Sequence, residues 1–170
     1  MKKEFWIAVI CAWLIFIAID FFFHATILVA YWNEDLPALK DLADLAFLIP
    51  IGYGSFFFLT LFIGWIYYQI FNSYPGKSKV LGFAFVFAGL FAVSNFLGLL
   101  SYIELPVSNL TLINLVYFVE ILAVIWVISL FQKVVSFKKL IGKLVLWFFL
   151  ILVFSIILQN IFQLYPGENM

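Results

Sequence analysis

The apolar run FWIAVICAWLIFIAIDFFFHATILVAYW, residues 5–32, decides the fold of this chain. About 20 apolar residues in a helix are enough to cross the hydrocarbon core of a bilayer. The run is longer than the ~7–15-residue core of a signal peptide, and no small-x-small cleavage motif ends it. It therefore predicts a retained membrane-spanning helix, with Asp20 and His24 inside the apolar stretch.

The chain as a whole has the composition of a membrane protein. Of its 170 residues, 67% are hydrophobic and 11% are charged, and the mean hydropathy is +1.20. Ordinary soluble domains are about 45–50% apolar and about 25% charged. We predict an all-α integral membrane bundle of five transmembrane helices, in which residues 1–170 form a single transmembrane domain. The predicted spans are residues 5–31, 48–72, 80–102, 109–132 and 142–164.

The segments between the spans carry turn signals. Pro50 falls where the first turn of the second span would tolerate a proline. A turn cluster occupies residues 72–76, and Pro106 separates the third span from the fourth. Residues 33–47 place leucines at helical spacing between acidic residues. This pattern leaves two alternatives, a short helix on the membrane surface or an early, wet start to the second span.

The placement of lysine predicts the orientation. Eight of the nine lysines lie before the first span, in the second loop, or in and next to the fourth loop, regions that share one side of a five-span chain. By the positive-inside rule the N-terminus is cytoplasmic and the C-terminus external. All basic residues are lysine, which is typical of an AT-rich bacterial genome, and we expect a multi-pass protein of the bacterial plasma (inner) membrane. No basic patch with stacking aromatics lies outside the spans, which argues against nucleic acid as a partner.

Polar residues inside the spans suggest a site. Asp20 and His24 share one face of the first span, because residues i and i+4 stack on a helix. An ionised side chain near the bilayer centre costs ~2.5–3.5 kcal/mol on insertion scales, so such groups should face one another or a wet cavity. We predict a ligand-binding or proton-linked site in the outer half of the membrane, formed by Asp20, His24, Asn95 and Glu120. Four further candidates lie around it: Tyr31, Ser94, Asn109 and Asn114.

Several functions fit this pattern. The leading hypothesis is a protein that binds or passes a small or lipid-like molecule through the polar pocket, with proton coupling. One alternative is a structural or accessory subunit of a membrane complex, in which the polar residues hold helices together through hydrogen bonds of ~0.6–2 kcal/mol each. Another is a lipid-modifying enzyme that uses His24 with Asp20 as acid and base. We expect a role other than catalysis, and the lipid bilayer with a homo-oligomer or another membrane protein as partners.

The sequence argues against several chemistries. A single histidine cannot supply a bis-histidine haem or a multi-histidine metal centre. No lysine lies deep in a span, which excludes a retinal-type Schiff base, and the common phosphate-loop and hydrolase motifs are missing. We therefore expect no cofactor and no metal, although Asp20, His24 and Glu120 together are a mixed carboxylate and imidazole donor set.

Two short motifs resemble those of a family of small bacterial integral membrane proteins of unknown function. They are D20-x-x-x-H24, followed by Tyr31, and L105-P-V-S108, followed by Glu120. The resemblance covers residues 10–132. Ala25 stands where members often have glycine, and many members lack a fifth span. The resemblance implies no activity, but it implies that Asp20, His24 and Glu120 are positions where these residue types serve a purpose.

Overall fold

The computed structural model of this chain describes residues 3–28, 42–133 and 136–164. The regular elements of these residues are all helical: α1 (Lys3–Phe22), η1 (Phe23–Ile27), α3 (Leu42–Ile70), α4 (Lys77–Tyr102), α5 (Val107–Lys133) and α6 (Phe137–Leu164). Five helices, the first formed by α1 with η1, are long and apolar enough to cross a membrane. This confirms the predicted class, an all-α bundle of five membrane-spanning helices. The cytoplasmic placement of the N-terminus stays a prediction.

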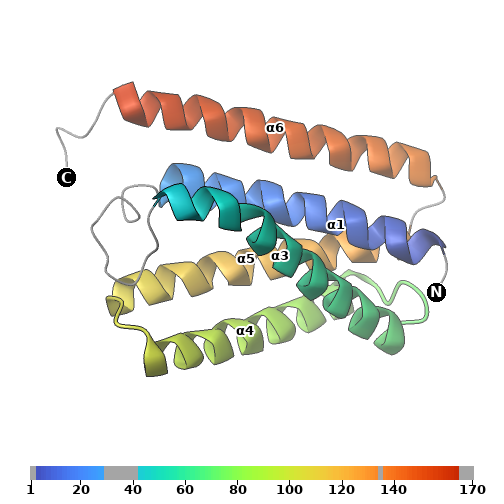
Figure 1. The fold of residues 1–170 in the computed structure, drawn as a ribbon. Coiled ribbons are helices and arrows are strands. Elements are labelled where there is room, and N and C mark those ends of the chain that lie inside the picture. Colours follow the sequence, from blue (N-terminus) through green and yellow to red (C-terminus); the bar gives the residue numbers. More distant parts are fainter. Residues whose placement is uncertain (1–2, 29–41, 134–135, 165–170) are drawn as a thin grey trace.

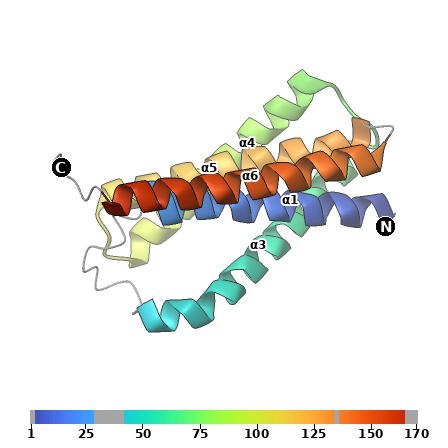
Figure 2. The same ribbon diagram turned by 90° about the horizontal axis from the view of Figure 1, so that it is seen from above.

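Helices α1 and α5 form the centre of the bundle. Helix α1 packs against α3, α5 and α6, whereas α4 packs mainly against α5. Figure 1 shows α6, α1, α5 and α4 in succession, with α3 crossing them obliquely. Seen from above in Figure 2, the axes of α1, α5 and α6 run roughly parallel, and α3 and α4 are inclined to them. In α1 and α5, 44% of the apolar stretch is buried, against 17% in each of the other three spans.

Small side chains allow the central helices to approach closely. Ala8, Ala12 and Ala18 of α1 are fully buried, as are Val124 and Ile128 of α5. Membrane helices gain little from the hydrophobic effect, so close contact between small and branched side chains supplies much of their packing energy. The interface between α1 and α5 at the centre of the bundle is therefore tightly packed.

The crossing of α1 and α3 depends on Gly64. A Cβ atom at Gly64 would lie 3.0 Å from Cγ2 of Val9, which is tighter than ordinary van der Waals contact. A glycine here lets the α3 backbone approach α1 closely. A larger residue would push the two helices apart.

Helix α3 begins earlier than predicted. It starts at Leu42, so residues 42–47 belong to the same helix as the second span, as the early-start alternative proposed. Residues 33–41 of that segment lie outside the described part. The expectation that Pro50 sits in the first helical turn is wrong, because Pro50 lies inside the helix. An interior proline lacks the N–H that would bond to the carbonyl four residues earlier, and Figure 1 shows α3 changing direction in its first half.

The first span ends in a π-helical turn, which sequence analysis did not predict. The backbone N–H of Leu28 donates to the carbonyl of Phe23, five residues earlier, at 2.8 Å. The same turn buries Thr26, whose hydroxyl donates to the carbonyl of Ser155 on α6 at 3.4 Å. Single π-helical turns are often found at functional sites, and this one contains His24.

Candidate functional site

Three ionisable side chains converge inside the bundle. Asp20 and His24 come from α1 and η1, and Glu120 comes from the middle of α5. One donor atom from each residue can be chosen so that all three lie within 4.8 Å of one another. Within this cluster, Nε2 of His24 lies 3.5 Å from Oδ1 of Asp20. We call these three residues the intramembrane cluster.

The three side chains of the cluster differ in burial. Glu120 is 0% exposed, and neither of its carboxylate oxygens has a hydrogen-bond partner among the described residues. The side chains of His24 and Asp20 retain 29% and 13% of their exposure. Glu120 is therefore the most deeply buried of the three residues.

The two carboxylates of the cluster interact electrostatically. Asp20 and Glu120 are close enough to repel each other when both are ionised. Inside an apolar bundle, little solvent is present to screen that repulsion. A proton or a cation between the carboxylates would remove it.

Aromatic side chains lie beside the cluster, and the sequence did not predict them. The rings of Phe16 and Phe56 stack at a centroid distance of 4.4 Å, and Phe56 also contacts Tyr117 edge to face. The hydroxyl groups of Tyr53 and Tyr117 lie within electrostatic range of Asp20. With 23 phenylalanines and eight tyrosines in the chain, the sequence offers no signal that separates these rings from lipid-facing ones.

Asn95 does not join the intramembrane cluster. Its Nδ2 donates to Oδ1 of Asn114 at 2.9 Å, and Nδ2 of Asn114 donates to the carbonyl of Leu110 at 2.7 Å. Asn114 precedes Glu120 by six residues, which is ~9 Å along the helix axis. This amide pair links α4 to α5 and is separate from the cluster.

The other predicted residues lie elsewhere. Asn109 is buried at the start of α5, where its Oδ1 accepts a hydrogen bond from the Ser108 hydroxyl at 3.3 Å. Ser94 is exposed on α4, and Tyr31 lies outside the described residues. The structure thus brings together the three ionisable candidates and leaves the amides and Ser94 apart from them.

An apolar groove of about 500 Å³ runs between α4 and α5. Its walls include Val93, Leu97 and Leu115, and Asn114 of the amide pair also lines it. A groove with such walls on a membrane-spanning surface has the chemistry of a site for a hydrocarbon chain.

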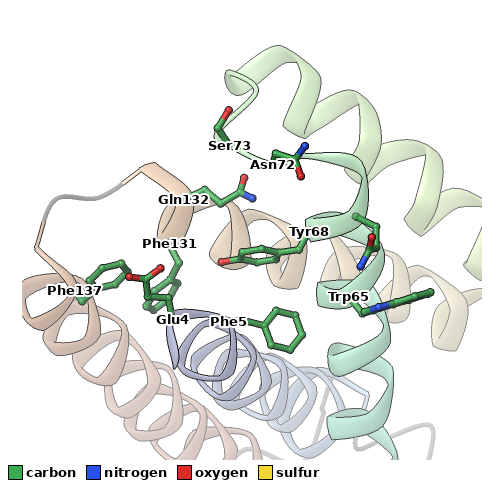
Figure 3. A pocket seen from close by; sticks show the side chains of 10 residues that line it. Glu4, Phe5, Trp65, Tyr68, Asn72, Ser73, Phe131, Gln132 and Phe137 are labelled. Atoms are coloured by element: carbon green, nitrogen blue, oxygen red, sulfur yellow. The ribbon is translucent and has the colours of Figure 1, made fainter. Parts of the chain in front are cut away.

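A second cavity, of about 490 Å³, lies at the end of the bundle that contains the start of α1. Figure 3 shows Phe5 of α1, Trp65 and Tyr68 of α3 and Gln132 of α5 around it. Its one charged lining residue, Glu4, is exposed, so that carboxylate remains hydrated. The lining combines amides and aromatic rings, without the buried ionisable groups that mark the intramembrane cluster.

The intramembrane cluster is the strongest candidate for a functional site. Ionisable side chains are rare in membrane spans and usually mark pathways or binding sites. Neither the groove nor the cavity just described is lined by Asp20, His24 or Glu120. Comparisons with family models, with curated proteins and with solved structures give no match to this chain.

Proposed function

We propose that this multi-pass membrane protein binds a small cationic ligand, or passes it through the bundle, at the intramembrane cluster in exchange for protons. The observation that carries the proposal is Glu120, a fully buried carboxylate without a hydrogen-bond partner among the described residues, placed beside a second carboxylate and an imidazole. The resemblance to a family of small bacterial membrane proteins supports the choice of the same residues, and a location in a bacterial plasma membrane stays a prediction.

The chemistry of the cluster favours a cation. Two carboxylates and a neutral imidazole offer lone pairs and, when ionised, a charge of −2 in an apolar surround. Such a charge is costly unless protons or a cation compensate it. Protons and a cation compete for the same oxygens, so binding of one releases the other. This competition is the physical basis of the proposed exchange.

A purely structural role is the main alternative. It would assign the cluster to helix association, but an interhelical hydrogen bond contributes only ~0.6–2 kcal/mol, and Glu120 makes none with the described residues. Amides serve that purpose elsewhere in this bundle, where Asn95 bonds to Asn114. The cluster is therefore an inefficient means of joining α1 to α5.

Two other hypotheses from the sequence make different predictions. A lipid-like ligand would find its hydrocarbon site in the α4–α5 groove, and retention of one defined lipid through purification would test that. A lipid-modifying enzyme would require turnover that disappears when His24 is replaced. Neither is supported by a contact of the intramembrane cluster.

The exchange can be tested by proton release. The full chain is reconstituted in nanodiscs in weak buffer with a pH-sensitive dye, and methylammonium, Na⁺, Mg²⁺, Mn²⁺ or Zn²⁺ is added. We expect at least one of these ions to release protons from the wild type. Glu120→Gln should abolish most of the release, because the substitution removes the carboxylate that binds the proton and the cation.

Glu104→Gln is the matched control, since it makes the same chemical change at an exposed carboxylate between α4 and α5. It should leave the release unchanged. Gel filtration and circular dichroism show whether each variant is folded. If Glu120→Gln does not fold, Asp20→Asn is tested in its place. The proposal fails if no ion releases protons from the wild type. It also fails if Glu120→Gln, like the Glu104→Gln control, releases as many protons as the wild type.

A further inference from the structure

We propose that the intramembrane cluster binds a divalent transition-metal ion. The ligands would be one ring nitrogen of His24, one oxygen of Asp20 and one oxygen of Glu120. This inference rests on the proposed function and names its ligand class. It replaces the expectation from sequence that this donor set holds no metal.

The distances fit a metal centre. Two donors bound to one ion at about 2.1 Å lie about 3.4 Å apart in a tetrahedral site and about 4.2 Å apart on opposite sides of an ion. Nε2 of His24 and Oδ1 of Asp20 are 3.5 Å apart, close to the tetrahedral value and longer than a strong hydrogen bond. All three residues offer a donor atom within 4.8 Å of the other two, so the longest separation shortens by up to about 1.4 Å to reach the tetrahedral value.

The unpartnered carboxylate is a second and independent observation. Glu120 is 0% exposed and lies beside the other two donors, yet the described residues offer its oxygens no hydrogen bond. Buried charges in proteins are paired or coordinate metals. The location of Glu120 in the central helix α5 directs this carboxylate toward the cluster rather than toward lipid.

The charge of the site favours a divalent ion. Two ionised carboxylates carry −2, and a neutral imidazole adds nothing, so one divalent cation makes the assembly neutral. A monovalent ion would leave one uncompensated charge inside the bundle, which is unfavourable in an apolar medium. Neutrality would also allow the loaded site to remain among apolar helices.

The imidazole selects the class of metal. Mg²⁺ and Ca²⁺ prefer sites made of oxygen ligands, whereas imidazole suits Zn²⁺, Fe²⁺, Co²⁺ and related ions. Three protein ligands leave a position for water or a solute, as in zinc sites that are not purely structural.

Co²⁺ is a suitable probe because its visible spectrum reports ligand number and geometry. The full chain, purified without a polyhistidine tag and stripped with a chelator, is titrated with Co²⁺ in nanodiscs, in a Cys11→Ser background that removes the chain's one thiol. We expect about one ion per chain with a four-coordinate spectrum. Zn²⁺ should displace the Co²⁺, whereas a roughly 100-fold excess of Mg²⁺ should not.

Replacing a ligand should weaken binding by roughly 100-fold or more, since even changes to outer-shell residues cost 10–100-fold. Glu120→Gln, Asp20→Asn and His24→Gln test the three ligands, and Glu104→Gln and Asn95→Leu are folded controls that should bind like the parent. Equal binding to parent and ligand variants, or Mg²⁺ displacing Co²⁺, would overturn the metal assignment. Proton release by methylammonium or Na⁺ without Co²⁺ binding would overturn it too, while leaving the proposed exchange intact.

Discussion

At the scale of single residues, Glu120 is the side chain whose placement most needs a functional explanation. It is fully buried in the central helix α5, one turn from Val124, which is also fully buried. A carboxyl group at this position contributes less to packing than an apolar side chain of similar volume would. Residues that lower stability in this way are usually retained for function.

Replacing Glu120 by methionine should therefore stabilise the protein. The substitution keeps a similar volume and removes two buried oxygens without a hydrogen-bond partner among the described residues, and a buried unsatisfied polar group costs about 1–3 kcal/mol. The measurement is denaturant unfolding in detergent with a chelator present, so that bound metal does not stabilise the parent. Val124→Ala is the control and should lower the same free energy by about 1 kcal/mol. A loss of stability in Glu120→Met would mean that the carboxyl group holds the helices together.

The sequence was sufficient to predict part of this site. Asp20 and His24 share a face because of their spacing, and the cost of an ionised group in lipid implied that Glu120 would turn toward them. The sequence could not show that Asn95 pairs with Asn114, because the partner of an amide depends on how two helices are rotated about their axes. The relative height of side chains along the helices was predictable, but the rotation of the helices was not.

At the scale of elements, the apolar runs predicted each helix because a span needs about 20 such residues. The runs did not predict the π-helical turn at Phe23–Ile27, since a change in hydrogen-bond register leaves no mark on hydropathy. The interior position of Pro50 was also missed, because Pro50 is equally compatible with a first turn and with a bend in the helix.

The Asn95–Asn114 bond gives a prediction at this scale. Asn95→Leu should lower the free energy of unfolding by about 1 kcal/mol, because interhelical hydrogen bonds in membranes contribute about that amount. It should not change Co²⁺ binding, since Asn95 lies outside the cluster. Ser94→Ala is the neighbouring control, and its exposed side chain should be replaceable without effect on stability. If Asn95→Leu abolished metal binding while the protein stayed folded, the separation of the two sites would be wrong.

At the scale of the whole molecule, the central pair α1 and α5 carries the ionisable cluster, and α3, α4 and α6 pack around this pair. Figure 1 shows α6 lying along α1 as the outermost layer of the bundle, and its Thr26–Ser155 hydrogen bond joins it to η1. The fifth span therefore covers the π-helical turn next to the cluster. The sequence alone gave no reason for a fifth span, whereas the structure shows that this span packs on η1.

The orientation of the bundle is a further prediction. Ser78 and Ser108 are both exposed and lie near opposite ends of the spans, at the start of α4 and of α5. The lysine pattern predicts that Ser78 faces the cytoplasm and Ser108 the outside. In a Cys11→Ser background, a membrane-impermeant maleimide should label Ser108→Cys in intact cells and Ser78→Cys only after permeabilisation. The reverse pattern would invert the orientation.

The most direct test of the central claim is zinc X-ray absorption on the full chain in nanodiscs. Because the chain contains a single histidine, an imidazole scattering signal from one ring identifies His24 as a ligand. We predict one imidazole nitrogen with the remaining ligands oxygen, and loss of an oxygen ligand in Glu120→Gln but not in Glu104→Gln. Zinc surrounded by oxygen alone, or an unchanged spectrum in Glu120→Gln, would contradict the claim that Asp20, His24 and Glu120 form one site.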